Sequence, residues 1–433
     1  MGGHVDHPAT PPCTACPACD LLLRQPPDDS GVTFFCPRCG KTLHKTIPQS
    51  VEKVLAFSLA GLLLFIPANF MPLVTMSILG LEKHSSIFDS VLALYDQGLF
   101  LVGSTVLSMA LLFPLVTLGL LCIVSLGIAT GRRSLLLLLL FRGYHYLTEW
   151  AMMDVYLIGI FVTIIKLSGM AKVHFDFGLF CFIGMVITAI AAQSCLSYQE
   201  FWQRLDPEHR QPPQAPYPAR TAREAGLVLC HTCQLLTADH PGGGQECRRC
   251  RSPLHMRKHD SLTRTWAMII CAVILLLPAN LMPIMEVEHF GLPDHSTILD
   301  GIVYFFHSGS YAIGLIIFTA SVVVPLFKIV GIVLILISIH FKLHSWLRHK
   351  ALMFRFIAFI GRWSMLDIFV IALLSALVQF GVLSTIQAAP AAFYFTGVVL
   401  STMLAAITFD SRVLWDIDIS TTEETLHGKT SRS

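Results

Sequence analysis

The hexapeptide Pro67-Ala68-Asn69-Phe70-Met71-Pro72 returns as Pro278-Ala279-Asn280-Leu281-Met282-Pro283, shifted by 211 positions (278 − 67). The same shift carries Cys36-Pro37-Arg38-Cys39 onto Cys247-Arg248-Arg249-Cys250. A constant offset between landmarks this far apart predicts a duplicated architecture, with one copy in each half of the chain. We expect a feature present in both copies to be scaffold, and a polar group present in only one copy to be a functional candidate.

The composition is typical of a membrane protein. Hydrophobic residues make up 54% of the chain and charged residues only 13%, against roughly 25% charged in soluble domains. Each half contains apolar runs near or above the roughly 20 residues that a helix needs to cross a bilayer. These runs lie near residues 54–79, 99–129, 150–168 and 175–196, and near 265–288, 310–340, 363–385 and 388–409. We therefore expect a mainly α, polytopic membrane protein built from two tandem four-helix transmembrane modules.

The basic residues predict how these modules are oriented. They gather between the second and third runs of each half, at Arg132, Arg133 and Arg142, and at Lys342, Arg348, Lys350, Arg355 and Arg362. Basic loops stay in the cytoplasm, which places both termini there. An even number of helices per half makes the two modules parallel rather than inverted. No cleavable signal peptide is visible, and the net charge of +2 gives no indication of nucleic-acid binding.

Paired cysteines precede each module. They form four C-x-x-C motifs: Cys16/Cys19 with Cys36/Cys39, and Cys230/Cys233 with Cys247/Cys250. This spacing is typical of zinc ribbons, and it predicts two structural zinc sites, each with four cysteine ligands and no open position for catalysis. Disulfides are the alternative, but they require an oxidising compartment, and the topology places these cysteines in the cytosol. Cys13 forms a further C-x-x-C with Cys16 and could compete as a ligand.

The domain organisation follows from these segments and from the proline-rich stretch between the halves. We expect a zinc ribbon at 1–50, a transmembrane module at 51–205, a linker at 206–225, a second ribbon at 226–260, a second module at 261–416 and a flexible tail at 417–433.

Prolines interrupt the first helix of each half. A proline lacks a backbone N–H and clashes with the preceding turn, so the freed carbonyls need partners. We expect the asparagine between the prolines to bond this loosened backbone. Because the motif is duplicated, scaffold is favoured over a substrate site. The residues concerned are Pro67, Asn69, Pro72, Pro278, Asn280 and Pro283.

Charge inside the apolar runs is the strongest functional signal, because a charge in hydrocarbon costs at least about 2.5 kcal/mol. Lys328 has Thr117 as its first-half equivalent, whereas Asp367 has Asp154, at a shift of 213 (367 − 154). The lysine is therefore unique to the second half. We expect a polar network of Ser321, Lys328, Ser364, Asp367 and Thr402. The alternative is that Lys328 snorkels to the membrane surface and that Asp367 caps or orients a helix.

These features together resemble the paraquat-inducible protein A family: paired four-cysteine ribbons, two four-helix modules, and P-A-N-x-M-P and W-x-M-x-D motifs in each half. The resemblance covers roughly residues 13–418. It implies an inner-membrane location in Gram-negative bacteria and a partner with an MCE domain that forms a hydrophobic tunnel across the periplasm. The membrane subunit would then load phospholipid into the tunnel or unload it, in support of outer-membrane integrity.

Energy for such transport would have to come from another subunit or from protons, since no G-x-x-x-x-G-K-[ST] nucleotide-binding motif is present. Proton coupling through Asp367 and Lys328 is the natural hypothesis. Two alternatives remain open: a non-transporting membrane anchor for the tunnel protein, and a cytosolic redox sensor that uses its C-x-x-C pairs. No nucleophile–base constellation favours an enzyme.

Overall fold

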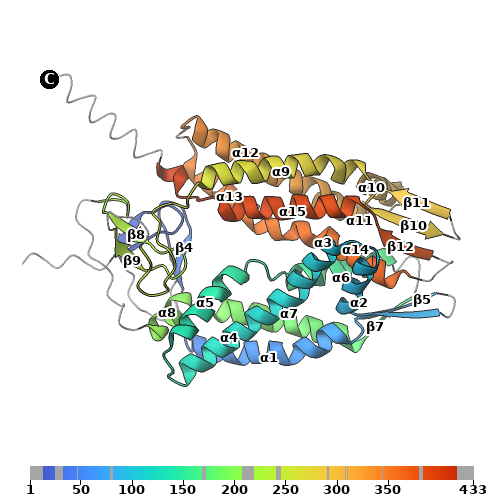
Figure 1. Ribbon diagram of the computed structural model, residues 1–433, viewed down its shortest axis with the longest axis horizontal. Helices are drawn as coiled ribbons and strands as arrows, with labels where there is room; N and C mark the ends of the chain where they lie inside the picture. Colours follow the sequence, from blue (N-terminus) through green and yellow to red (C-terminus); the bar gives the residue numbers. More distant parts are fainter. Residues whose placement is uncertain are drawn as a thin grey trace, which may run out of the picture.

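The computed structural model describes residues 13–24, 33–45, 47–78, 81–167, 172–206, 219–239, 245–289, 292–307, 309, 311–343, 345–379 and 384–416. Two helical halves lie side by side, with short ribbon strands at one end of the molecule and longer strands at the other (Figure 1). The predicted tail at 417–433 and most of the predicted linker lie outside the described residues.

The first half begins with two short hairpins and continues into helices. Its elements are β1 (Cys13–Ala15), β2 (Leu22–Arg24), β3 (Thr33–Phe35), β4 (Thr42–Lys45), α1 (Ser50–Phe70), β5 (Val74–Ile78), β6 (Leu81–Ser85), α2 (Ile87–Asp96), α3 (Phe100–Val106), the π-helix η1 (Leu107–Leu112), α4 (Phe113–Ala129), α5 (Leu135–Leu147), α6 (Met153–Leu167), β7 (Lys172–Phe175), α7 (Phe177–Cys195) and α8 (Tyr198–Leu205).

The second half repeats this order. Its elements are β8 (Leu227–Leu229), β9 (Leu236–Ala238), α9 (Ser261–Leu281), β10 (Met285–His289), β11 (Leu292–Ser296), α10 (Ile298–His307), α11 (Tyr311–Phe318), the π-helix η2 (Thr319–Val323), α12 (Val324–His340), α13 (Leu347–Gly361), the 3-10 segment η3 (Arg362–Met365), α14 (Leu366–Leu377), β12 (Ser384–Ala388) and α15 (Ala391–Thr408).

Within the described residues, seven helices are long and apolar enough to cross a membrane. In the first half, two shorter helices, α5 and α6, stand where the second half has one nearly continuous helix over Leu347–Leu377. The expected loops between the second and third runs are therefore largely helical, because Arg142 lies in α5 and Arg348, Lys350 and Arg355 lie in α13. Only Arg132, Arg133 and Lys342 lie in the short turns between the helices.

The first helix of each half ends earlier than the apolar run predicted. α1 ends at Phe70 and α9 at Leu281, and strands β5 (to Ile78) and β10 (to His289) stand where the apolar runs predicted helix. The residue before the second proline is extended in both copies, with φ/ψ of −83°/152° at Met71 and −87°/156° at Met282. A residue that precedes proline avoids the helical region, which explains the stop.

A three-stranded antiparallel sheet follows each break, ordered β6-β5-β7 in the first half and β11-β10-β12 in the second. The hairpin registers correspond, since Val74 pairs with Ser85 and Met285 pairs with Ser296. Both sheets lie at the end of the molecule opposite the ribbons (Figure 1). The third strand comes from just before the last helix of each half, so the sheet ties the first helix to the last.

The second proline of each break bonds to the start of α7 or α15. Pro72 O accepts from Gly178 N at 3.2 Å, and Pro283 O accepts from Ala391 N at 3.2 Å. Those N–H groups belong to the first turn of a helix and have no intrahelical partner. Asn69 Nδ2 donates to Phe65 O at 2.7 Å, and Asn280 Nδ2 donates to Leu276 O at 2.9 Å. The same set of bonds therefore surrounds the break in both copies.

The second helix of each half contains a π-helical turn directly before its proline. η1 leads into Pro114 and η2 into Pro325. A π-turn shifts the hydrogen-bond register by one residue, and such turns are frequent at functional sites. Ser321 lies in η2, so one of the predicted polar residues occupies this irregular backbone.

The third helices of the two halves pack against each other at the centre of the molecule. The Tyr156 ring on α6 meets the Phe369 ring on α14 edge to face, with centroids 5.0 Å apart. Gly159 allows this approach, because an added Cβ would lie 3.3 Å from the Phe369 Cβ. The main hydrophobic core runs continuously through this contact and joins the halves.

Candidate functional site

Two groups of four buried cysteines converge in the ribbons. The four Sγ atoms of Cys16, Cys19, Cys36 and Cys39 lie within 4.8 Å of one another, and so do those of Cys230, Cys233, Cys247 and Cys250. Opposite sulfurs approach to 3.5 Å, as between Cys16 and Cys39 and between Cys230 and Cys250. Zinc with Zn–S bonds of about 2.3 Å places its ligands about 3.8 Å apart. Both groups therefore fit a tetrahedral metal ion.

All four C-x-x-C turns share one backbone geometry. In each, the N–H four residues after the first cysteine donates to that cysteine's carbonyl, as Gly40 N does to Cys36 O at 2.8 Å. The donor residue has positive φ each time: Asp20 61°, Gly40 71°, Gln234 56° and Arg251 54°. Only one of these four donor residues is glycine. The turn therefore imposes positive φ even on residues that do not favour it.

Cys13 lies outside the first metal group. It belongs to β1 and packs in a small core with Ala222 and Leu229, where the two ribbons meet. The four converging thiols are those of the two regular C-x-x-C pairs.

The close thiols of each centre shift one another's pKa in opposite directions. Hydrogen bonds from neighbouring cysteines lower the pKa of Cys39 and Cys230 and raise the pKa of Cys19 and Cys233. The buried Ser252 hydroxyl lies 2.9 Å from Cys250 Sγ and 3.2 Å from Cys230 Sγ. The equivalent position in the first ribbon is Lys41 (252 − 211). The two centres therefore differ in their surroundings although their ligands match.

The five residues of the predicted polar network lie on elements that pack together in the second half. Ser321 is in η2, Lys328 in α12, Ser364 in η3, Asp367 in α14 and Thr402 in α15. η3 packs against η2 and α15, and α12 packs against α15. Four of the five side chains are at most 2% exposed, and Asp367 is partly exposed. We call Ser321, Lys328, Ser364, Asp367 and Thr402 the polar cluster.

Lys328 is held inside the protein. Its side chain is 1% exposed, and its Nζ lies 3.5 Å from the carbonyl of Gly361, the last residue of α13. The backbone changes to 3-10 geometry directly after Gly361, which changes the direction of the nearby carbonyls. The pairing of Lys328 with Asp367 stays a prediction.

The rest of the polar cluster offers further hydrogen-bonding capacity. The buried Ser364 Oγ has no hydrogen-bond partner among the described residues. Thr402 Oγ1 donates to Val399 O at 2.9 Å. An unsatisfied buried hydroxyl can hold a polar group or a water molecule, because unpaired buried polar atoms are costly.

The equivalent region of the first half is less polar. Thr117 takes the place of Lys328, and its hydroxyl donates to Phe113 O at 2.8 Å within its own helix. Ala110 and Ala151 replace Ser321 and Ser364 and are buried. Lys328, Ser321 and Ser364 are therefore specific to the second half, whereas Asp367 has its counterpart in Asp154.

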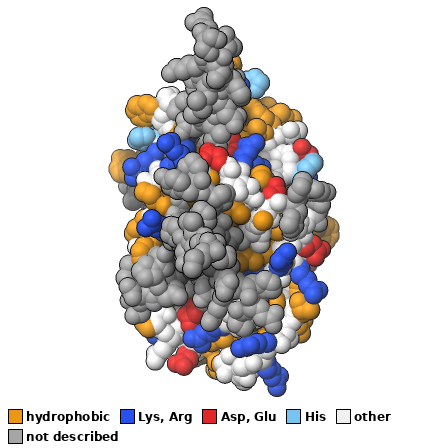
Figure 2. Space-filling view, turned by 90° about the vertical axis from the view of Figure 1, so that its left-hand side faces the viewer, with side chains coloured by type: hydrophobic (Ala, Val, Ile, Leu, Met, Phe, Trp, Pro, Cys, Tyr) orange, Lys and Arg blue, Asp and Glu red, His pale blue; other side chains and the backbone are white. Residues whose placement is uncertain are grey.

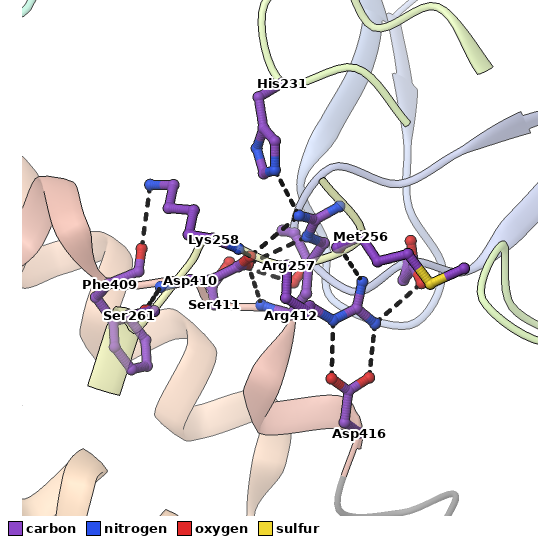
Figure 3. Close-up of polar contacts among 12 residues, drawn as sticks. His231, Met256, Arg257, Lys258, Ser261, Phe409, Asp410, Ser411, Arg412 and Asp416 are labelled. Carbon is purple, nitrogen blue, oxygen red and sulfur yellow. Dashed lines mark hydrogen bonds and ion pairs between the residues drawn. The ribbon is translucent and has the colours of Figure 1, made fainter. Parts of the chain in front are cut away.

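A buried set of ion pairs lies where the ribbons meet the helices (Figure 3). The Arg257 guanidinium donates to Asp416 at 2.6 and 2.8 Å and to Asp20 at 3.1 Å. Burial disfavours the charge of Arg257, but the Asp416 and Asp20 carboxylates outweigh it and raise the pKa of the guanidinium. Sequence reasoning missed this contact, because Asp20, Arg257 and Asp416 lie far apart in the chain.

A second pair, between Arg412 and Asp410, lies beside it. Arg412 Nη2 is 3.0 Å from Asp410 Oδ2 and 2.6 Å from His231 Nε2 (Figure 3). Burial alone would raise the pKa of Asp410, but Arg412 lowers it overall. Burial, reinforced by Arg412, lowers the pKa of His231 to about 4, so this ring is neutral. Seen from outside, the ribbon end carries Lys and Arg side chains among its other residues (Figure 2).

Comparison with known proteins identifies the relatives of this chain. The family described as "Paraquat-inducible protein A" matches twice, at residues 51–206 and 262–418. The two matches begin 211 residues apart (262 − 51), which confirms the internal repeat.

Individual relatives extend over almost the whole chain. "Lipophilic envelope-spanning tunnel protein A" of Escherichia coli (strain K12) is 35% identical over 93% of this chain and 90% of its own length. "Intermembrane transport protein PqiA" of the same strain is 32% identical over 93% of this chain and 95% of its own. A "Probable intermembrane transport protein" of Haemophilus influenzae is 31% identical over 93% and 95%. No solved structure gives a significant match.

Proposed function

Because this chain belongs to the paraquat-inducible protein A family, we propose that it is the membrane subunit of a lipid transport system of the Gram-negative cell envelope. Its relatives carry names that refer to an envelope-spanning tunnel and to intermembrane transport. On this proposal the chain moves phospholipid between the inner membrane and a periplasm-spanning tunnel built by an MCE-domain partner. The polar cluster of the second half is the observation that carries the proposal.

In this proposal, the second half contains the transport site. Burying Lys328 at 1% exposure inside a membrane helix is expensive, and the first half does without it by using Thr117. The irregular turns η2 and η3 place loosened backbone next to this lysine. A site with polar groups and broken helices at membrane depth is typical of transporters.

Coupling to protons supplies the energy in this proposal. Asp367 lies in the first turn of α14, six residues after Gly361 (367 − 361), whose carbonyl holds Lys328 Nζ. Protonation of Asp367 would change its attraction for Lys328 and shift α14 relative to α12. Moving one charge across the membrane is worth about 2.3 kcal/mol per 100 mV, which is enough to bias such a pair of states.

The proposed topology places the ribbons and both termini in the cytoplasm and the two three-stranded sheets in the periplasm. The sheets and the ribbons lie at opposite ends of the molecule (Figure 1), which supports two modules in parallel orientation. Each ribbon would hold one structural zinc ion, through Cys16, Cys19, Cys36 and Cys39 and through Cys230, Cys233, Cys247 and Cys250. The zinc would supply folding energy to a segment too small to fold without it.

The test is an outer-membrane barrier assay, such as detergent sensitivity, in cells that depend on this protein. We expect Asp367→Asn and Lys328→Ala to abolish function at normal protein levels. The matched first-half variants Asp154→Asn and Thr117→Ala should keep most of it. Full activity of both second-half variants would contradict transport through the polar cluster and would favour the alternative, a non-transporting anchor for the tunnel protein.

A further inference from the structure

We propose that each ribbon clamps the helices of the opposite half, so that metal bound in the first ribbon holds the ribbon end of the second half, and the reverse. The order along the chain suggests that each ribbon serves the module that follows it. In the structure, each ribbon instead contacts the helices of the other half. This inference does not depend on the transported substrate.

The first ribbon rests on the second half. Its cysteines share a hydrophobic core with residues of α9, α12 and α13 and with Leu414 and Trp415. The Arg38 guanidinium lies over the Trp415 ring, 4.4 Å from its centroid. Arg355 of α13 donates to the Cys39 carbonyl, and Ser411 Oγ donates to Ala18 O at 3.3 Å.

The second ribbon rests on the first half in the same way. Its cysteines share a core with residues of α1, α4 and α5 and with Phe201 and Trp202 of α8. Arg142 of α5 donates to the Arg251 carbonyl at 3.1 Å. Two further contacts join the ribbon to this half: Tyr146 OH with Thr232 Oγ1 at 3.2 Å, and Arg249 with Asp206 at 3.8 Å.

The two crossed contacts are copies of each other. Arg38 and Arg249 are equivalent (249 − 38 = 211), and each is the residue before the last cysteine of its ribbon. Arg142 and Arg355 are equivalent at the third-helix shift (355 − 142 = 213), and each donates to a carbonyl of the last C-x-x-C turn of the opposite ribbon. A contact that the repeat builds twice from equivalent arginines is an intrinsic part of the fold.

Metal must control this contact because the contacting atoms belong to the metal-binding turn itself. Arg38 stands between Cys36 and Cys39, and the acceptor for Arg355 is the carbonyl of Cys39, whose sulfur is a ligand candidate. A ribbon of this size has little core of its own and depends on its metal to hold its backbone. Without metal, the turn that receives Arg355 loses its fixed geometry.

The consequence for the second half is specific. Arg355 lies in α13, whose last residue, Gly361, provides the carbonyl next to Lys328. The first ribbon therefore holds the helix that leads into the polar cluster, and the second ribbon holds α5, its first-half counterpart. The segment Phe409–Asp416 cannot distinguish the two ribbons, because both touch it. The first ribbon contacts Trp415, and the second contacts Arg412.

Hydrogen exchange measured by mass spectrometry on the full chain in lipid nanodiscs tests the proposal. The variant Cys16→Ser/Cys19→Ser removes half of the first metal site, and Cys230→Ser/Cys233→Ser is its matched control. We expect the first pair to raise exchange in peptides from α13 at least about threefold more than in peptides from α5. The control should reverse the order. Greater exchange in α5 than in α13 for the first pair, or equal exchange in both, would overturn the crossed clamp.

A second set of variants covers the case in which cysteine variants fail to fold. Arg355→Ala and Arg142→Ala keep every metal ligand and remove one crossed contact each. With two metal ions still bound by elemental analysis, Arg355→Ala should raise exchange in peptides around Cys39, and Arg142→Ala should raise it in peptides around Cys250. If Arg355→Ala leaves the first ribbon unchanged while metal is retained, α13 does not hold the first ribbon, and the proposal is wrong.

Discussion

The Arg38 guanidinium lies 4.4 Å from the centre of the Trp415 ring, so the first ribbon contacts the far end of the second half. A cation over an indole face contributes roughly 0.5–2 kcal/mol, more when it is shielded from water. Trp415 is 6% exposed and its ring completes the core beneath the ribbon. The two halves are therefore joined at the ribbon end as well as through α6 and α14.

Metal content distinguishes the ligand set. We expect two zinc ions per chain, one for each four-cysteine group. Cys19→Ser should lose one of them, because three thiolates hold zinc far less tightly. Cys13→Ser is the matched control and should keep both, since Cys13 packs in the β1 core instead. Elemental analysis of purified protein decides this, and loss of zinc in Cys13→Ser would contradict the assignment of ligands.

Arg257 should be the most sensitive residue at the ribbon end. Arg257→Ala removes charge-assisted hydrogen bonds to Asp20 and Asp416, and each such bond contributes about 1.5–3 kcal/mol. We expect a clear fall in the thermal unfolding midpoint.

Arg223→Ala is the control for this change. Arg223 also approaches Asp416, at 3.4 Å, but it is 52% exposed, and exposed pairs contribute about 0–1 kcal/mol. An equal effect of the two variants would show that burial of Arg257 does not matter.

Gly178 should resist substitution. A Cβ there would lie 2.5 Å from Pro72 O and 2.7 Å from Met71 O, so Gly178→Ala forces the proline break away from the start of α7. Overpacking of this kind costs typically about 1–3 kcal/mol. The second half has Ala391 at this position with the same backbone bond, so Ala391→Gly should cost no more than about 1 kcal/mol. Thermal unfolding of both variants should show the larger loss of stability in Gly178→Ala, and an equal or larger loss in Ala391→Gly would contradict the close approach at Gly178.

Asp410 should give a pH-dependent contribution to stability. Its pKa in the folded protein is below the ordinary value of 3.8, with Arg412 outweighing burial. A carboxylate with a depressed pKa stabilises the fold above the unfolded pKa and loses this contribution as pH falls through the folded value.

The difference in unfolding midpoint between the wild type and Asp410→Asn should thus be constant from about pH 5 to pH 8 and shrink below about pH 4. Subtracting the variant removes the effect of acid on the cysteine sites, which both proteins share. A difference that grows on acidification would reverse the expected sign.

The sequence predicted the repeat, the cysteine groups and most helices, because these depend on spacing and local composition. The offset of 211 is repeated in the family matches, and the predicted ligands are the cysteines that converge. The strands β5 and β10 were missed, because a short apolar run after a proline looks the same in a helix and in a buried strand.

The sequence pattern could not predict that each ribbon packs against the opposite half. Two equivalent ribbons and two equivalent helical halves can pair in either way, and the pattern of residues is identical in both cases. Arg38 and Arg249 were visible as equivalent positions, but only the structure shows which half each ribbon touches, through the bonds of Arg355 to the Cys39 carbonyl and of Arg142 to the Arg251 carbonyl. The π-turns were missed for a similar reason, since composition does not encode a one-residue shift in register.

The most direct test of the central claim is lipid movement by purified protein reconstituted with the proposed tunnel partner, measured as transfer of labelled phospholipid from vesicles to the tunnel. Lys328→Met keeps the length of the side chain and removes its charge, and Thr117→Val is the matched change in the first half. We predict at least about a tenfold loss of transfer in Lys328→Met and wild-type transfer in Thr117→Val. Wild-type transfer in Lys328→Met, with the protein folded and bound to its partner, would contradict a working site in the second half.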